Sequence, residues 1–443
     1  MAVPILPPGP GCPPLVQGLR FLWRPTAWLE SCAHRFGDPF TMRLPVGPPT
    51  AIFSHPDAVR EIFTVGADAL RAGEANAPLG PLLGASSILL LDGVRHAAVR
   101  RMMLPPFHGE RLLAWGDTIR NVAAGVIDRW SVGRPLRVRD AMQAITFEVI
   151  LRAVFGLADE QRRRLIQERL ERLVAAARSP AFLWPALQRD LGRWSPWGRF
   201  VRLRQSIDDI LFAEIAARRA TGSADRGDVL SLLLAARDEA GGALDDAEVR
   251  DQMLTLFLAG HETTATALAW AVHHLVAHPL VLERLRAELA AGPLDTRRLA
   301  DLAYLGAVVN ETLRLTPVLD GVGRLLARPV RVAGWLLPAG AAVAASIYLT
   351  HRRPDVWAEP ARFDPERFVG LRPSPYAFLP FGGGTRRCVG MAFALYEMKL
   401  VLAEIVTRVD LQHAPGHRTG VVRRAITLAP SAGMRVVVTR RAA

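Results

Sequence analysis

The stretch FGGGTRRCVG, from Phe381 to Gly390, contains four glycines, two arginines and one cysteine. A helical pattern, VGMAFALYEMKL, begins directly after Cys388. Backbone N–H groups at a helix start lower the pKa of a nearby thiol, which favours a thiolate that can bind a metal. Free cysteines are also among the most buried residue types. The stretch alone therefore leaves two interpretations of Cys388 open: a metal ligand, or an inert structural residue.

The spacing within this stretch favours the metal ligand. Five positions match the pattern F-x-x-G-x-R-x-C-x-G: Phe381, Gly384, Arg386, Cys388 and Gly390. This pattern resembles the haem-binding loop of the cytochrome P-450 monooxygenases. Three further motifs of that family follow its order along the chain: AGHETT at 259–264, ETLR at 311–314 and PERF at 365–368. The resemblance covers essentially the whole chain and implies a haem b held by the thiolate of Cys388.

Four cationic or imidazole side chains are candidates to bind the haem propionates, which need cationic partners when they are partly buried. The segment HAAVRR places His96 and Arg100 four residues apart, on one face of a helix. By resemblance, these two side chains reach propionates, as do Arg324 in GVGRLL and Arg386 in the cysteine stretch. The alternative for each of them is a solvated surface charge.

The ETLR motif places Glu311 and Arg314 three residues apart on a predicted helix. On a surface, such a pair contributes little to stability. In the resembled family the pair faces inward and joins an arginine of the later motif, which is Arg367 here. The resemblance therefore implies a structural lock near the proximal side of the haem, and loss of one charge would leave the others buried without compensation.

The longest predicted helix runs from about Asp246 to His278 and would be roughly 50 Å long at 1.5 Å per residue. Its predicted start is an Asp cap with Glu248 three positions after Asp245, and Pro279 marks its predicted end. Its middle is apolar on nearly all sides, which indicates a buried helix. The resemblance gives this helix the oxygen-activating groove. Gly260 would leave room for dioxygen beside the backbone, and Glu262 and Thr263 would deliver protons for O–O cleavage. Catalysis is thus expected to depend on Glu262 and Thr263.

The segment HETTA, from His261 to Ala265, also begins like the zinc-protease motif H-E-x-x-H. That motif needs two histidines four residues apart on one helix face to bind zinc. Ala265 stands where the second histidine is required. The zinc-protease alternative is therefore rejected.

The chain has 443 residues, of which 50% are hydrophobic and 22% charged, so it can bury a large core. Helical patterns dominate, and strands are predicted near both ends, including a hairpin over AITLAPSAGMRVVVTR. We expect a mainly α (α+β) fold, with a long central helix and a small β-rich lobe. No linker is evident, which predicts one domain over 1–443 with a proline-rich segment at about 1–14.

Three cysteines in a chain of this length argue against a disulfide framework and for a reducing compartment. The N-terminus lacks the basic start and the apolar run of a signal peptide. One apolar run, from Val332 to Thr350, contains Pro338 and Gly340 and is predicted to form two strands around a turn. The prediction is a cytoplasmic protein without a membrane anchor, expected to be a monomer.

The stretch MMLPPFHGERLLAWG, from Met102 to Gly116, resembles a bacterial, cyanobacterial-type P-450 subgroup acting on fatty acids and terpenoids. This resemblance implies a hydrophobic substrate: a fatty acid, a terpenoid or a polyketide. The family layout suggests a substrate site lined by the segment 73–91. The same layout suggests further lining residues for this site: Phe182, Leu183, Trp184, Leu256, Phe257, Ala259, Leu319, Val322 and Leu428. The alternative is that many of these residues only form the core.

The net charge of +13 could attract nucleic acid, an anionic membrane or an acidic protein. The sequence shows no zinc finger and no compact basic arm, so no nucleic-acid partner is expected. It also shows no flavin or nicotinamide domain and no iron–sulfur cysteine cluster. Electrons are therefore expected from a ferredoxin or flavodoxin with its reductase. A peroxide-driven peroxygenase, a haem-thiolate isomerase and a non-catalytic haem-thiolate sensor remain as alternatives to the monooxygenase.

Overall fold

The computed structural model describes residues 3–441 apart from 67, 157–159, 178–187 and 223–226. Helix makes up 57% of the chain and strand 11%, so the predicted mainly α fold with a minority of strands is confirmed. The chain forms two compact units. Unit 1 comprises 1–72, 116–145 and 263–443, and unit 2 comprises 73–115 and 146–262. A single domain over 1–443 stays a prediction.

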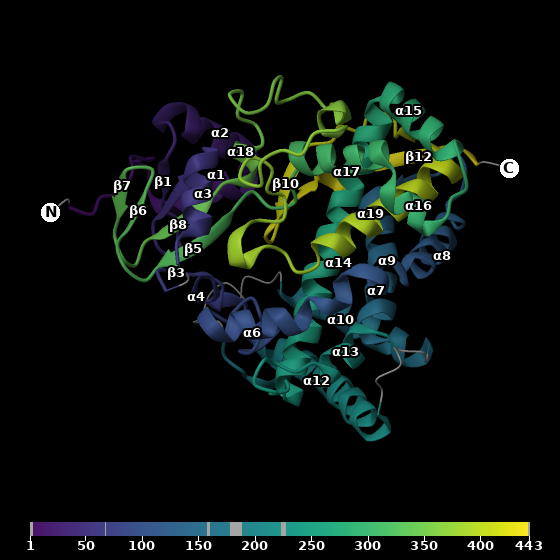
Figure 1. Cartoon of the computed structure of the whole chain (residues 1–443), viewed down its shortest axis with the longest axis horizontal. Helices are drawn as coiled ribbons and strands as arrows, with labels where there is room; N and C mark the ends of the chain where they lie inside the picture. The colour runs from purple at the N-terminus through teal and green to yellow at the C-terminus, as the bar shows by residue number, and fades with distance from the viewer. Residues whose placement is uncertain (1–2, 67, 157–159, 178–187, 223–226, 442–443) are drawn as a thin grey trace. The chain divides into compact units, whose positions relative to one another are not determined.

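The strands that the structure describes all belong to unit 1 (Figure 1). The largest sheet has the order β1 (Phe40–Met42), β2 (Thr50–Phe53), β8 (Ala342–Ala345), β5 (Val322–Leu326) and β3 (Leu70–Arg71). Only β2 and β8 run parallel to each other in this sheet. Three smaller sheets complete the unit: β10 (Val421–Arg424) with β11 (Thr427–Pro430), β4 (Pro135–Arg137) with β12 (Arg435–Arg441) and β9 (Val409–His413), and β6 (Val330–Val332) with β7 (Trp335–Leu337).

The predicted C-terminal hairpin over AITLAPSAGMRVVVTR is wrong. β11 pairs with β10, and the turn between these strands contains Ala425, whose φ is 53°. β12 lies instead between β4 and β9. Ala432 and Met434 both have a φ of 50°, a conformation that turns the chain sharply between β11 and β12. The two strands therefore enter different sheets.

The apolar run from Val332 to Thr350 forms the two predicted strands, β7 and β8, but these strands belong to different sheets. Among the residues described, no single helix is long and apolar enough to cross a membrane. One bent pair of helices, Asp246–Ala277 with Pro279–Ala290, meets the length and composition criteria together, with an angle of 107° between them.

Most of the remaining structure is helical. Unit 1 contains α1 (Pro14–Trp23), α2 (Pro25–Phe36), α3 (Pro56–Thr64), α8 (Gly116–Ile127), α15 (Pro279–Ala290), α16 (Thr296–Asp301), α17 (Ala303–Leu315), α18 (Ile347–Thr350) and α19 (Met391–Arg408). Unit 2 contains α5 (Gly80–Leu83), α6 (Gly93–Met103), α7 (Gly109–Leu113), α10 (Glu160–Ala177), α12 (Pro196–Thr221) and α13 (Val229–Ala235). Three helices include residues of both units: α4 (Ala72–Ala75), α9 (Val138–Ile150) and α14 (Asp246–Ala277).

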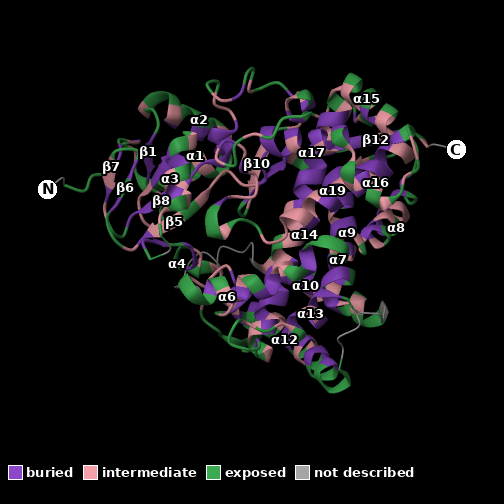
Figure 2. Cartoon of the chain, viewed as in Figure 1, coloured by how far each residue is buried: buried purple, intermediate pink, exposed green. Residues whose placement is uncertain are grey.

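The long central helix is α14, and its start agrees with the predicted cap. The backbone N–H of Glu248 donates to Asp245 Oδ1 at 2.7 Å, and the backbone N–H of Asp245 donates to Glu248 Oε2 at 3.0 Å. This reciprocal capping box satisfies two otherwise unpaired donors. The helix ends at Ala277, two residues before Pro279 begins α15. Figure 2 shows α17 and α19 as largely buried helices of unit 1.

Glu397 is an ionisable residue in the buried part of α19. It is 2% exposed, and burial raises the pKa of its carboxyl group to about 8. The folded-state pKa thus lies above the unfolded-state value of about 4.5. This group therefore contributes its stability fully below pH 4.5 and loses it as the pH rises through 8.

We expect Glu397→Gln to remove this loss, because glutamine stays neutral. The free energy of unfolding of the variant minus that of the wild type should therefore rise by on the order of a few kcal/mol when the pH is raised from 5 to 9. Glu404 on the same helix is the matched control: it is also buried, but it accepts hydrogen bonds from Arg120 and Arg408, each at 2.6 Å. Glu404→Gln should destabilise the protein at neutral pH. Denaturant unfolding at several pH values checks both, and an unchanged pH dependence in Glu397→Gln would contradict the argument.

Candidate functional site

The loop that carries Cys388 is held by its own backbone. The N–H of Cys388 donates to the carbonyl of Phe381 at 3.0 Å, and the N–H of Arg387 donates to the carbonyl of Gly384 at 3.2 Å. Gly382 and Gly384 have φ values of 67° and 62°, which glycine adopts without a steric penalty. The glycines therefore allow the chain to fold back and fix the position of Cys388.

The same loop lies against α3, which begins at Pro56 with His55 as its N-cap. A Cβ atom at Gly383 would lie 2.3 Å from the ring of Phe63, and one at Gly384 would lie 2.7 Å from the carbonyl oxygen of Phe63. Both distances are far below van der Waals contact. Close approach to α3 thus favours glycine at both positions, and at Gly384 the positive φ favours it as well.

Cys388 is exposed and precedes Gly390, the N-cap of α19, by two residues. The helix therefore begins slightly later than the sequence suggested, at Met391. A Cβ atom at Gly390 would meet nothing within 4 Å. Packing within the protein does not require this glycine, whereas a flat ligand approaching the loop would benefit from it.

Glu311 and Arg314 of α17 form a fully buried ion pair. Arg314 donates from Nε to Glu311 Oε2 at 2.6 Å and from Nη2 to Glu311 Oε1 at 2.7 Å, and both side chains are 0% exposed. The backbone N–H of Asp364 also donates to Glu311 Oε1, at 2.8 Å. Arg367 Nε lies 3.5 Å from the same oxygen. The structure thus brings the three predicted residues together in the interior of unit 1.

Arg314 also binds the backbone of the following segment. It donates to three carbonyl oxygens: those of His351 and Pro360, each at 2.8 Å, and that of Arg362 at 3.0 Å. Arg367 donates to the carbonyl of Glu359 at 3.0 Å. The arginines therefore hold α17 and the chain between 351 and 364 as one assembly.

His351 is a site residue that the sequence reasoning missed. It is fully buried, its Nδ1 lies 3.2 Å from the carbonyl oxygen of Arg314, and its Nε2 accepts from the N–H of Leu379 at 2.9 Å. Burial lowers the pKa of its imidazole to about 3, so it stays neutral and can donate from Nδ1. His351 thereby connects the end of α17 to the segment that leads into the Cys388 loop. An isolated histidine before Arg-Arg-Pro gives no periodic signal that would have revealed this.

Two faces of α14 differ in burial near the AGHETT motif. Leu256, Ala259, Gly260 and Thr263 follow the helical i, i+3, i+4, i+7 spacing, and Ala259 is exposed while the other three are partly buried. Phe257 lies on another face and is 0% exposed. These four residues form one stripe of small or apolar side chains that ends in Thr263. The oxygen-activating groove stays a prediction.

His261 and Phe257 pack against α9. The carbonyl oxygen of His261 accepts from Thr146 Oγ1 at 3.1 Å, and its Nδ1 lies 3.2 Å from the same hydroxyl. The ring centroid of Phe147 lies 4.9 Å from that of Phe257 and 5.0 Å from that of His261. Phe257 thus packs in the interior of unit 2, and its substrate-lining role stays a prediction. Glu262 is partly buried on the same helix.

The predicted propionate ligands occur in both units. In unit 1, Arg324 lies on β5 and Arg386 in the Cys388 loop, and both are partly buried. In unit 2, His96 and Arg100 lie one turn apart on α6, with His96 5% exposed and Arg100 partly buried. Their role towards a haem stays a prediction.

The remaining substrate candidates have different environments. Leu319 and Val322 are partly buried and pack beside a cluster that contains Leu379, and Val322 lies next to Gly382 of the cysteine loop. Leu428 is 2% exposed and belongs to a core cluster with Trp28, and its lining role stays a prediction. Phe182, Leu183 and Trp184 lie outside the described residues.

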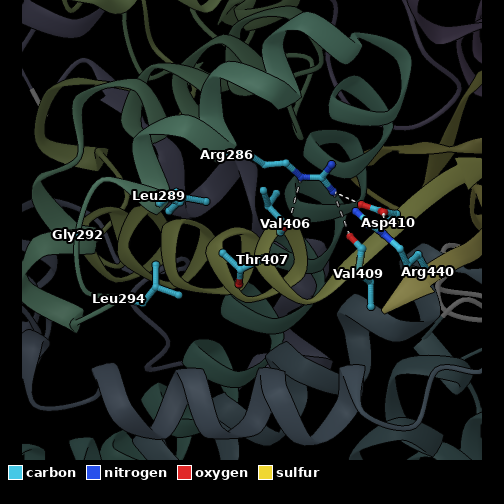
Figure 3. Close-up of a pocket in the computed structure, with 10 residues that line it drawn as sticks. Arg286, Leu289, Gly292, Leu294, Val406, Thr407, Val409, Asp410 and Arg440 are labelled. Carbon is cyan, nitrogen blue, oxygen red and sulfur yellow. Dashed lines mark hydrogen bonds and ion pairs between the residues drawn. The ribbon is translucent and has the colours of Figure 1, made fainter. Parts of the chain in front are cut away.

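A pocket of about 430 Å³ lies elsewhere in unit 1, on α15, α19, β9 and β12 (Figure 3). Its polar side is an ion-pair group in which Asp410 binds both Arg286 and Arg440. Leu289, Leu294 and Val406 are among its apolar residues. Neither Cys388 nor Thr263 lines this pocket, so it is not the candidate active site.

The residues of unit 1 fit a haem-thiolate group. The only cysteine that is exposed, Cys388, lies at the end of a loop fixed by hydrogen bonds and beside a glycine with open space. Arg386 supplies a cation in the same loop. One soft thiolate with nearby cations is the donor set that haem iron and propionates require.

Comparisons with known proteins agree with this fit. The family model described as cytochrome P450 matches residues 7–431. Cytochrome P450 135B1 of Mycobacterium tuberculosis is 39% identical over 98% of this chain and 91% of its own length. Cytochrome P450 135A1 of the same organism is 36% identical over 98% of this chain and 96% of its own.

Two solved structures share the fold. "Retinoic acid bound cyanobacterial CYP120A1" has a TM-score of 0.87 at 28% identity and is covered completely, as is this chain. "Crystal structure of cytochrome P450DA heme domain" has a TM-score of 0.87 at 23% identity, with 99% of this chain and 98% of the other covered. The chain belongs to the cytochrome P450 family. It is a monooxygenase whose cofactor is a haem with a cysteine thiolate ligand.

Proposed function

We propose that this cytochrome P450 hydroxylates or epoxidises a hydrophobic small molecule, a fatty acid, terpenoid or polyketide, with electrons from a ferredoxin or flavodoxin and its reductase. The observation that carries the substrate class is the likeness over the full chain to a structure whose title names bound retinoic acid. Retinoic acid is an isoprenoid carboxylic acid. The stripe of Leu256, Ala259 and Gly260 on α14 is consistent with an apolar ligand.

In the proposed site, the residues around the haem have distinct roles. Cys388 is the thiolate ligand, and the backbone bond to Phe381 fixes its position. Arg386, Arg324, His96 and Arg100 hold the propionates. When bound, the haem supplies the chemistry of dioxygen binding and O–O cleavage.

The proton path of the proposal uses the end of the small-residue stripe on α14. In this proposal the lack of a side chain at Gly260 leaves room for dioxygen beside the helix, although a Cβ atom there would also lie 2.8 Å from Ile150 Cδ1. Thr263 lies three residues further along the same face and holds a proton-donating hydroxyl or water there. Glu262 supplies the proton from the neighbouring position, because a carboxyl group in an apolar helix is maintained only if it serves a partner or solvent.

Titration of the ferric holoenzyme tests the substrate class. Retinoic acid, palmitic acid and a macrolide polyketide are added separately, and the low-spin to high-spin shift of the Soret band is followed. We expect saturable shifts with at least one of the two lipids. Saturation by the polyketide alone would remove the isoprenoid and fatty-acid classes from the proposal, and no shift with any of the three would contradict it.

Thr263→Ala is expected to keep haem and substrate binding but to divert most electrons to hydrogen peroxide. The hydroxyl that positions the proton is lost, while the shape of the stripe is retained. Product formed per electron consumed should fall roughly tenfold or more, since general acid catalysis contributes factors of 10²–10⁴. Parallel assays of product, peroxide and cofactor consumption check this. Unchanged coupling would remove Thr263 from the proton path and would favour the peroxygenase alternative.

The proposed electron donor is an acidic protein that docks near Cys388, because the chain carries a net charge of +13 and Arg387 is exposed in the cysteine loop. Reduction by a ferredoxin should slow as the ionic strength rises. At low ionic strength, Arg387→Glu should be reduced more slowly than the wild type, while its haem absorption spectrum stays unchanged. A rate insensitive to both changes would contradict electrostatic docking. The proposal also includes a cytoplasmic location.

A further inference from the structure

The pocket of about 430 Å³ on α15, α19, β9 and β12 has an apolar end and a charged end (Figure 3). Leu289 and Leu294 lie at the apolar end. The charged end carries three side chains that hydrogen bonds connect: Arg286, Asp410 and Arg440. A volume of this size is typical of sites for small molecules. The change from apolar to charged along the pocket indicates a ligand with an apolar body and a charged head group.

The charged end is shaped by a β-bulge in the pairing of β12 with β9. Val438 pairs with Leu411, and the next pair is Arg440 with Asp410. Thr439 is the extra residue of the bulge, and its hydroxyl donates to the carbonyl of Asp410 at 3.3 Å. A shift of one residue in register moves a side chain to the other face of its sheet. The bulge therefore brings Arg440 to the face on which Asp410 lies.

Asp410 binds each arginine through a different oxygen. Its Oδ2 accepts from Arg440 Nε at 2.7 Å, and its Oδ1 accepts from Arg286 Nη2. Burial raises the pKa of this carboxyl group, but the hydrogen bonds from Arg440 and Arg286 outweigh burial and hold the pKa below its ordinary value. Asp410 is therefore ionised at neutral pH. Two guanidinium groups and one carboxylate leave the charged end with a single net positive charge.

Both arginines keep N–H groups that are available to a ligand. Arg286 Nε and Nη2 donate to the carbonyls of Val406 at 3.4 Å and Val409 at 3.5 Å. Among the residues that the structure describes, Arg286 Nη1 and both Nη atoms of Arg440 have no hydrogen-bond acceptor. The side chain of Arg440 is 76% exposed, so a ligand can reach it. A guanidinium group binds a carboxylate through two parallel N–H bonds, which matches these donors.

The apolar end is held in place by the protein itself. Arg298 donates to the carbonyls of Leu289 at 3.3 Å and Gly292 at 3.1 Å. Arg120 donates to the carbonyl of Leu294. These bonds fix the end of α15 and the loop that follows it. A preformed wall of this kind lowers the entropic cost of binding a ligand.

We propose that this pocket is a binding site for an amphipathic monocarboxylate, whose carboxylate binds the two arginines and whose alkyl chain lies against Leu289 and Leu294. One negative charge balances the net charge of the charged end, whereas a cationic ligand would be repelled. The alkyl chain gains free energy by removing apolar surface from water. The inference goes beyond the proposed function, because no residue assigned to the haem or to the proton path lines this pocket.

Calorimetric titration of the holoenzyme with octanoate tests the site, with saturating 4-phenylimidazole present to occupy the haem iron. Two further compounds separate the contributions: 1-octanol has the chain without the charge, and acetate has the charge without the chain. We expect a single class of octanoate site in the wild type. Binding of 1-octanol and of acetate should each be weaker by about fivefold or more, since a hydrogen bond to a charged group and the burial of a chain both contribute.

Arg440→Gln should weaken octanoate binding by about fivefold or more and leave the affinity for 1-octanol unchanged. Arg435→Gln is the matched control, because it makes the same change in charge at an exposed arginine of β12 that does not line the pocket. Leu294→Glu places a negative charge at the apolar end and should also weaken octanoate binding. Absence of octanoate binding in the presence of 4-phenylimidazole, equal binding of octanoate and 1-octanol, or equal effects of Arg440→Gln and Arg435→Gln would overturn the inference.

Discussion

Arg314→Ala is expected to yield a protein that does not retain haem and that unfolds far more readily than the wild type. Removal of the guanidinium takes away both bonds of the bidentate pair and leaves the carboxylate of Glu311, which is 0% exposed, with the N–H of Asp364 and with Arg367 at 3.5 Å. Breaking a buried pair in this way typically costs about 3–5 kcal/mol. The carbonyls of His351, Pro360 and Arg362 also lose their donor, so the loss should lie at the upper end of that range.

Arg362→Ala is the matched control for this change. Arg362 and Glu359 form an ion pair with the same three-residue spacing at 3.0 Å, but their side chains are 62% and 69% exposed. Its loss should change the free energy of unfolding by less than about 1 kcal/mol. Haem content per chain and denaturant unfolding are measured for both variants. Normal haem content in Arg314→Ala, or equal effects of the two changes, would contradict a locking role for the buried pair.

Cys388→Ser is the second change with a large expected effect. Serine retains the loop, because the bond from residue 388 to Phe381 uses the backbone. The thiolate, which favours O–O cleavage, is lost. Turnover of any accepted substrate should therefore fall by at least about a hundredfold, while circular dichroism stays that of the wild type.

Cys12→Ser serves as the control for Cys388→Ser, because Cys12 is a partly buried cysteine that packs with the cluster around Trp28. It should retain full turnover. If both serine variants kept their activity, Cys388 would not be the ligand. If both variants lost activity and also lost the wild-type circular dichroism signal, the loss of activity would reflect misfolding. The haem spectrum of Cys388→Ser would then decide whether Cys388 is the ligand.

The sequence predicted those parts of the molecule that depend on local signals. The capping box of Asp245 and Glu248 located the start of α14, and Pro279 located its end, because caps and prolines act within one turn. The positive φ values of Gly382 and Gly384 in the cysteine loop are likewise a local property, because glycine adopts them without a steric penalty. The inward direction of Glu311 and Arg314 came from the family resemblance, since their spacing alone is also that of a surface pair.

Features that depend on distant parts of the chain were not predictable in this way. His351 acquires its position from contacts to Arg314 and Leu379, which are 37 and 28 residues away. Leu428 and Phe257 look like other apolar residues in the sequence, and only packing shows that they belong to cores. The hairpin prediction failed for the same reason, because β12 pairs with β4 and β9, which lie earlier in the chain, rather than with β11.

The carbon-monoxide difference spectrum of the reduced protein tests the central claim most directly. Full-length wild type and Cys388→Ser are loaded with haem, reduced and exposed to carbon monoxide under identical conditions. The account predicts the strongly red-shifted Soret band of thiolate ligation in the wild type and its loss in Cys388→Ser. A wild type without the red-shifted band, or a serine variant that retains it, would contradict the assignment of Cys388 as the haem ligand.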